Sequence, residues 1–208
     1  TDTRPVAVNG FAIPYDYQDP VVTETMRRGD TAAVIICKMN NDAVVKSLHG
    51  GLRGHGNYTR IHGNKGVMEN TRHGDKQRLR VWYEPWEKRK STPVETVYKP
   101  DFPLHHNEAT HAGHGGGDFF TSYYFSKAIR TNEQPYLDVY RGIDMSIAGI
   151  QAWRSALNDS TSMEIPDFRK ESVRLKYAND HWSPDPNRKN ENQPLPSVLG
   201  NIEPKIGR

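Results

Sequence analysis

The sequence has little of what marks secreted or membrane-spanning chains. It contains a single cysteine, Cys37, inside the apolar run 32–37. One cysteine cannot form an intrachain disulfide, and we expect its thiol to be buried in a strand. No stretch approaches the ~18 apolar residues of a membrane helix, and the N-terminus has no signal-peptide pattern. These absences favour a cytoplasmic protein with no membrane partner.

The chain also lacks a strong excess of either charge and is poor in apolar residues. Its 28 lysines and arginines against 25 aspartates and glutamates give a formal charge of +3. These charges are interspersed and form no basic tail, so we expect no nucleic-acid partner. Hydrophobic residues make up 35% of the chain and the mean hydropathy is −0.83. Such values indicate a folded domain with long polar loops or an extended terminal segment.

Three motifs of nucleotide-binding and nucleophilic enzymes are missing. No Gly-x-Gly-x-x-Gly follows a strand, and the nearest fit, at 113–118, has Asp118 in place of the sixth residue. No Walker loop and no Gly-x-Ser-x-Gly nucleophile elbow are present. The residues alone therefore contain no counterpart of a dinucleotide-binding domain.

Alternating apolar residues and turn residues predict a meander of strands in the first half of the chain. The predicted strands are 6–13, 31–39, 43–52, 57–62, 67–70, 78–84 and 93–99. Two main helices follow, at 118–130 with Asp118 as N-cap and at 139–158 with Asp138 as N-cap, and a short one lies within 169–179. Strands followed by helices indicate an α+β fold, an open-faced, mostly antiparallel mixed sheet with helices packed on one face.

The predicted helix 139–158 has an apolar stripe that we expect to face the core. Its members follow helical spacing and are Ile143, Ile147, Ile150, Trp153 and Leu157. We expect Tyr123 and Tyr124 of the preceding helix to fill the same core between helices and sheet.

Proline-rich sequence marks a boundary near residue 180. Beyond it stand Pro184, Pro186, Pro194, Pro196 and Pro204 among polar residues. We therefore expect a domain over 1–180 and an extended Pro-rich arm over 181–208. Because the chain begins at Thr1 without an initiator Met, we also expect a processed product or a piece of a longer protein.

Titratable side chains are concentrated between the predicted sheet and the first helix. His105, His106, Glu108, His111 and His114 fall within ten residues, and three glycines follow. Glycines allow sharp turns and close approach to a ligand, so we predict a site in this segment, at the rim of the open sheet face. A metal site built from four of these residues is an alternative, although no His-Glu-x-x-His pattern supports it.

A second polar segment, 50–56, is rich in glycine. His49, Arg53 and His55 lie in or beside it and could contact a ligand's hydroxyl groups. A β-bulge with solvated polar residues is the alternative.

Several blocks resemble a known family. The runs 30–37, 48–51 and 58–70 resemble the C-terminal domain of the Gfo/Idh/MocA oxidoreductase superfamily. The block 113–119, Gly-His-Gly-Gly-Gly-Asp-Phe, resembles the Gly-His-Gly-Gly-x-Asp loop of the NAD-dependent glycoside hydrolases in that superfamily. The resemblance covers about residues 6–168.

The resemblance implies the C-terminal, substrate-binding half of an NAD(P)-dependent oxidoreductase of a sugar or glycoside. The missing Rossmann domain would hold NAD or NADP, so this chain should bind no cofactor and be catalytically silent by itself. His114 would transfer the proton, with His111 and His106 in the substrate site. The helix beginning at Asp118 would keep His114 unprotonated near neutral pH.

Two further functions stay open from the resemblance. One is an NAD-dependent glycoside hydrolase that acts through a transient keto-sugar. The other is a non-catalytic module for carbohydrate binding or oligomerisation. The family also implies a homo-oligomer formed through the open face of the sheet.

Overall fold

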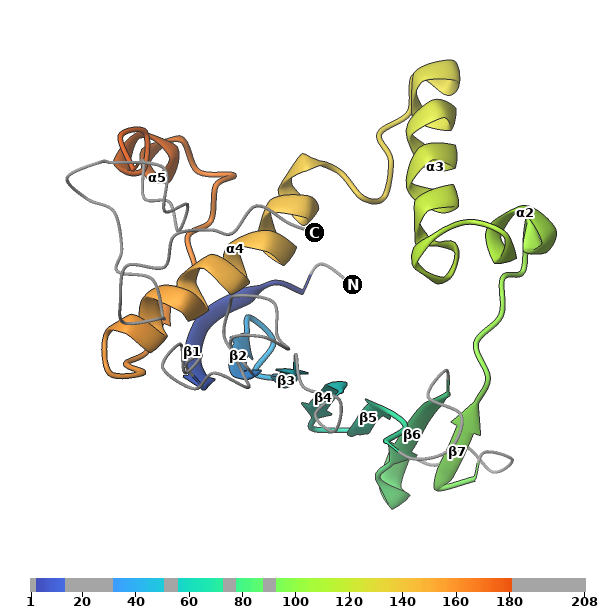
Figure 1. The fold of residues 1–208 in the computed structure, drawn as a ribbon, viewed down its shortest axis with the longest axis horizontal. Helices are drawn as coiled ribbons and strands as arrows, with labels where there is room; N and C mark the ends of the chain where they lie inside the picture. Colours follow the sequence, from blue (N-terminus) through green and yellow to red (C-terminus); the bar gives the residue numbers. More distant parts are fainter. Residues whose placement is uncertain (1–2, 14–31, 51–55, 73–77, 88–92, 181–208) are drawn as a thin grey trace, which may run out of the picture.

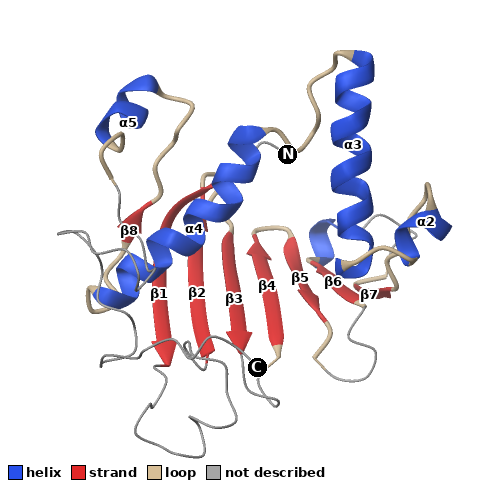
Figure 2. Cartoon of the chain, turned by 45° about the horizontal axis from the view of Figure 1, so that its top comes forward, coloured by secondary structure: helices blue, strands red, loops and turns tan. Residues whose placement is uncertain are grey.

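The computed structural model describes residues 3–13, 32–50, 56–72, 78–87 and 93–180, whose arrangement is shown in Figures 1 and 2. They contain one open sheet of eight strands in the order β7-β6-β5-β4-β3-β2-β1-β8. Every described strand pair is antiparallel. The predicted α+β fold is confirmed, although the sheet that we expected to be mixed has no parallel pair among these strands.

The strands follow the predicted meander closely. They are β1 (Pro5–Ile13), β2 (Ala32–Met39), β3 (Val44–Gly50), β4 (Asn57–Gly63), β5 (Gly66–Asn70), β6 (Leu79–Tyr83), β7 (Glu95–Tyr98) and β8 (Met163–Glu164). Sequence reasoning missed β8, which has two residues and pairs with β1 at the edge of the sheet. Two residues carry no alternating pattern, so no signal marked this strand.

One short 3-10 helix, η1 (Pro85–Glu87), lies between β6 and β7, and the other helices follow β7. They are α2 (His106–Thr110), η2 (His114–Gly116), α3 (Gly117–Thr131), α4 (Val139–Leu157) and α5 (Glu171–Lys176). Asp138 caps α4 as predicted, because its side chain accepts a hydrogen bond from the Arg141 backbone N–H at 2.8 Å. None of the described helices is long and apolar enough to span a bilayer. The predicted arm 181–208 lies outside the described residues.

Helix α4 covers the sheet over β1 and β2 (Figure 2). The core between them is small: Val8, Cys37, Ala152 and Ile165 are buried together. Cys37 is a buried free thiol, as predicted, and burial raises its pKa. A side chain on Gly10 would overlap the carbonyl of Ala152, so α4 rests directly on the β1 backbone.

This close approach changes which face of α4 is buried. Ile150 and Leu157, which we predicted to face the core, are 45% and 40% exposed. The buried positions are instead Asp144, Gln151, Ala152 and Ser155. The prediction was wrong for Ile150 and Leu157, because only small or hydrogen-bonded side chains fit where helix and strand backbones nearly touch. Ile147 of the same stripe does pack against the core.

Hydrogen bonds and ion pairs hold Ser155 and Asp144, two of the polar side chains that this packing buries, whereas Gln151 Oε1 is buried without a hydrogen-bond partner among the described residues. Ser155 Oγ accepts from the Gly10 backbone N–H at 3.0 Å and donates to the Thr161 carbonyl at 2.5 Å. Asp144 lies between two arginines: its Oδ1 is 3.3 Å from Arg4 Nε, and its Oδ2 is 2.8 Å from Arg169 Nη2. These bonds tie the N-terminal strand, α4 and the segment after α4 into one unit.

Helix α3 does not cover the sheet. Together with α2 and η2 it forms a separate helical unit, the α2–α3 unit, which stands away from α4 in both views (Figures 1 and 2). None of its residues from Gly117 to Thr131 is buried, and Tyr124 and Phe125 are exposed. The expectation that Tyr123 and Tyr124 fill a core between helix and sheet is therefore wrong. Their rings lie in an aromatic cluster on the α2–α3 unit itself.

Because β1 and α4 are in close contact at Gly10, adding a methyl group there should destabilise the fold. We expect Gly10→Ala to lower the free energy of unfolding by about 1–3 kcal/mol, because the added Cβ must push α4 off the strand. Chemical denaturation followed by circular dichroism measures this change.

The matched control is Gly149→Ala, on the helix α4 that packs against Gly10. A Cβ there meets nothing within 4 Å, so alanine should stabilise the helix by about 0.5–1 kcal/mol. Equal stabilities for the two variants would show that α4 does not rest on Gly10.

Candidate active site

The histidine-rich segment forms two short helices rather than the loop that we predicted. His106 begins α2, and His114 begins η2, which leads directly into α3. Both pack on α3 and on one another, and no described contact of comparable extent joins them to the sheet. The segment therefore belongs to the α2–α3 unit.

Asp118 is not the N-cap of α3. The cap position is Gly116, with φ 96°, and Asp118 lies inside the first turn. Its carboxylate instead faces His114: Nδ1 lies 2.9 Å from Oδ1 and 3.0 Å from Oδ2. The cap prediction failed because three consecutive residues with positive φ, His114 to Gly116, precede the helix and move its start.

The ion pair also shifts the pKa of His114 in the direction opposite to the one that we expected. Its hydrogen bond to Asp118, and then the Asp118 charge, raise the pKa of His114 above the ordinary histidine value. We had expected the helix N-terminus to lower it. A carboxylate in direct contact outweighs the partial charge of a helix end, which falls off within one turn.

Glycines shape the space around this pair. A Cβ on Gly113 would overlap Asp118 Oδ2, so the absence of a side chain at position 113 makes room for the carboxylate. A Cβ on Gly116 would overlap the Phe102 ring, which packs on Phe120 at 5.1 Å between centroids. The Gly-His-Gly-Gly-Gly-Asp sequence thus leaves room for both the ion pair and the packing of Phe102 against Phe120 of α3.

The other predicted histidines have separate partners. His106 Nδ1 lies 2.7 Å from Asp101 Oδ1, and His111 Nδ1 lies 2.6 Å from the Asn107 carbonyl. The pKa of Asp101 is lowered, first by the Phe102 backbone N–H and then by His106. His106, His111 and His114 share the α2–α3 unit, but each has its own hydrogen-bond partner.

The remaining predicted contacts lie elsewhere or outside the described residues. His49 is an exposed residue of β3, opposite Ala33 and Asn57 in the sheet. Arg53 and His55 lie outside the described residues. Among the residues that the structure describes, no group of three or more His, Cys, Asp or Glu is placed to hold a metal ion. The metal alternative therefore has no support from this part of the chain.

A shallow groove of about 470 Å³ runs along α3 beside the ion pair. Its lining residues are Ala112, Asp118, Phe119, Ser122, Tyr123 and Ser126. Asp118, Ser122 and Ser126 are spaced four apart and form a polar stripe, and Phe119 and Tyr123 form an aromatic stripe next to it. Sequence reasoning missed these stripes because it assigned this face of the helix to the core.

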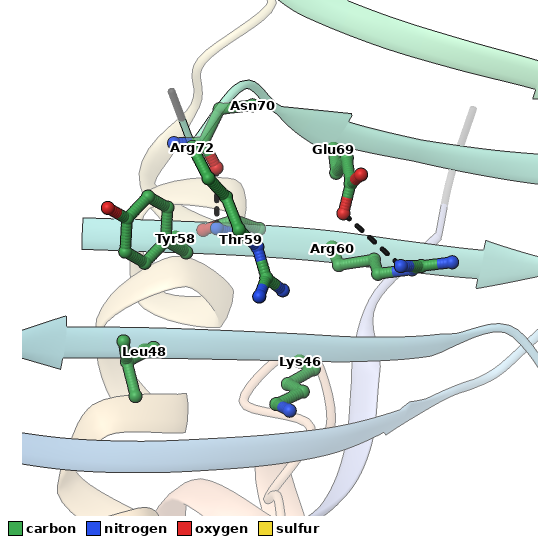
Figure 3. A pocket seen from close by; sticks show the side chains of 8 residues that line it. All are labelled: Lys46, Leu48, Tyr58, Thr59, Arg60, Glu69, Asn70 and Arg72. Atoms are coloured by element: carbon green, nitrogen blue, oxygen red, sulfur yellow. Dashed lines mark hydrogen bonds and ion pairs between the residues drawn. The ribbon is translucent and has the colours of Figure 1, made fainter. Parts of the chain in front are cut away.

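A second, smaller pocket of about 110 Å³ lies on the sheet (Figure 3). Lys46, Arg60, Glu69 and Arg80 stand opposite one another on adjacent strands. Lys46 comes directly after Val45, which packs against the core under α4, so Lys46 points to the opposite face. The residues paired with Lys46 across the sheet point the same way, and the row therefore lies on the open face. Glu69 Oε2 lies 3.3 Å from Arg60 Nη1, and Glu69 Oε1 lies 3.5 Å from Arg80 Nη1, so these ion pairs link β5 to β4 and β6. The charges are largely satisfied within the sheet.

The sequence matches a protein family over most of its length. Residues 8–174 match the family described as "Glycosyl hydrolase 109, C-terminal domain". The chain belongs to this family. A comparison with curated proteins gives no match.

Solved structures share the fold. A levoglucosan dehydrogenase in complex with NADH and L-sorbose superimposes with a TM-score of 0.54 at 15% identity. The same enzyme with NADH and levoglucosan gives 0.54 at 16%, and an oxidoreductase domain protein from Kribbella flavida gives 0.54 at 17%. Each alignment covers 79% of this chain but only 45% of the other. The resemblance to the Gfo/Idh/MocA C-terminal domain is confirmed, and the chain spans less than half the length of these proteins.

Proposed function

We propose that this chain is the sugar-binding half of an NAD(P)-dependent enzyme that oxidises a ring carbon of a sugar or glycoside. The observation that carries the proposal is the His114–Asp118 pair beside the groove on α3, within the residues that match a glycosyl hydrolase family. In this proposal the nicotinamide is bound by a domain that is not among these 208 residues. The solved structures that share the fold include sugar dehydrogenases with bound NADH, which supports the assignment.

The groove has the chemistry that a sugar needs. Serine hydroxyls can donate to and accept from sugar hydroxyls, a carboxylate can accept from them, and aromatic faces can pack against the C–H face of the ring. The groove is open, so another domain can close it. The nicotinamide, when bound, supplies the hydride acceptor, and His114 takes up the hydroxyl proton. His106 and His111 remain candidates for contacts to substrate hydroxyls from α2.

Hydrolysis through a transient keto-sugar is the second candidate, and the family match favours it. A ketone on the ring makes the neighbouring C–H more acidic. Removal of that proton allows the glycosidic substituent one carbon further on to leave, water then adds, and the ketone is reduced again. The net reaction consumes water and leaves the dinucleotide unchanged. Simple oxidation instead accumulates a keto-sugar and reduced dinucleotide, so product analysis separates the two reactions.

A non-catalytic role in oligomerisation rests on the open face of the sheet. The apolar side chains exposed on this face are Phe11, Ile13, Ile36, Val44, Trp82 and Val97. Such residues seldom remain in water over a contiguous area. We propose that this face binds a second copy of the chain.

Removing the imidazole of His114 tests the proposed chemistry. In a protein that joins this chain to its dinucleotide-binding domain, His114→Ala should lower kcat by roughly 10²–10⁴, because it removes the proton acceptor. His114→Asn should lose as much, since an amide keeps a hydrogen bond but carries no proton. The assay follows reduced dinucleotide and released sugar during turnover of glycosides.

The matched control is His62→Ala, an exposed histidine on β4 in the sheet. Its kcat should equal that of the wild type. If both His114 variants turn over substrate within about threefold of the wild type while remaining folded, the assignment of His114 is wrong.

Placing a charge on the open face tests the proposed oligomer. Ile36→Glu should shift the chain towards monomer in sedimentation velocity at micromolar concentration, because it buries a carboxylate in the interface. Met145→Glu, at a 72% exposed position on α4, lies on the other side of the sheet and should assemble like the wild type. A wild-type chain that is monomeric over the whole concentration range would contradict the proposal.

A further inference from the structure

Asp118 has a role in the candidate site that the family resemblance did not assign. Resting on the proposed function, we propose that Asp118 is a positioning residue: its carboxylate holds the His114 imidazole through Nδ1, so that Nε2 is the atom that exchanges the proton with the sugar. The Nδ1–H then donates to the carboxylate, and the Nε2 lone pair is available to accept.

The hydrogen bonds place the imidazole at a defined position. Nδ1 lies almost equally far from the two carboxylate oxygens, at 2.9 and 3.0 Å. The His114 side chain is 87% exposed, so packing does not hold the ring, and the described bonds use Nδ1 only. The Asp118 carboxylate is therefore the feature that orients the ring.

The backbone supports this arrangement at a cost. His114 has φ 51°, a left-handed conformation that is unfavourable for a non-glycine residue. Gly115 and Gly116 continue the turn with φ 63° and 96°, which brings His114 back over the first turn of α3. A strained histidine that ends beside a carboxylate is consistent with a functional constraint rather than with a simple helix start.

Gly113 provides the space for the carboxylate. A Cβ at this position would overlap Asp118 Oδ2, although its φ of −65° and ψ of 167° suit any residue. Gly117 differs, because a Cβ there meets only the His114 Cβ, at 3.8 Å. The two glycines therefore make a matched pair: alanine at 113 should displace the carboxylate, and alanine at 117 should not.

The surrounding charges do not replace Asp118. The titratable groups on α2 and at its end, which packs against η2 and α3, are His106, Glu108 and His111. His106 pairs with Asp101, and His111 bonds to the Asn107 carbonyl. The raised pKa of His114 comes from Asp118, through the hydrogen bond first and the charge second.

The test measures the protonation and tautomer of His114 by NMR in the 208-residue chain. Of the nine histidine signals, the one that belongs to His114 is identified by its loss in His114→Gln. In the wild type, His114 should titrate above an ordinary histidine, and its neutral form should carry the proton on Nδ1. In Asp118→Asn and in Gly113→Ala the midpoint should fall towards the ordinary value and the Nδ1–H tautomer should decrease. Gly117→Ala should match the wild type.

Two results would overturn the proposal. One is an Asp118→Asn variant whose His114 midpoint and tautomer equal those of the wild type. The other is a Gly117→Ala variant that changes His114 as much as Gly113→Ala does. Neither measurement needs sugar or dinucleotide, so a negative result rejects the role of Asp118 while the proposed function is judged separately, by the turnover of the His114 variants.

Discussion

The contact between α4 and the backbone of β1 is the constraint on which the rest of the structure depends. Where Gly10 meets Ala152, helix and strand lie too close for side chains to intervene. Ser155, Gln151 and Asp144 are therefore buried and must find hydrogen-bond partners. Through those partners the contact also fixes the segment after α4.

Within the part of the chain that the structure describes, α4 is the helix that packs on the eight-stranded sheet, and much of the sheet has no helix over it. The open face carries exposed apolar side chains beside a row of charges in which Glu69 pairs with Arg60 and Arg80. The α2–α3 unit exposes an aromatic cluster, and α3 stands away from the sheet (Figure 1). Uncovered surfaces of this kind are typical of a part that functions in contact with other domains or copies. This agrees with the proposal that a dinucleotide-binding domain closes the groove on α3.

The strands β1–β7 and the positions of α3 and α4 could be predicted because alternation, helical spacing and turn residues are local signals. Residues that face water on one side and the core on the other repeat every second position whatever covers the sheet. The buried face of α4 could not be predicted in this way. It depends on Gly10, which is more than a hundred residues away, and this contact selects small and polar residues over Ile150 and Leu157.

The segment that the sequence singled out contains the His114–Asp118 pair, but the geometry of this pair was not predicted. Histidines and glycines within a few residues indicated a site there, and that assignment stays a prediction. The role of Asp118 could not be read from the sequence because it depends on the positive φ of His114, Gly115 and Gly116. An aspartate before a predicted helix is most often its cap, and only the backbone shows that here it pairs with a histidine.

The most direct test is a crystal structure of the protein that joins this chain to its dinucleotide-binding domain, with NAD and a sugar bound. The account predicts the sugar in the groove on α3, with a ring hydroxyl about 3 Å from His114 Nε2 and with Nδ1 still bonded to Asp118. A sugar bound instead over Lys46, Tyr58 and Arg60 on the open face of the sheet would contradict it.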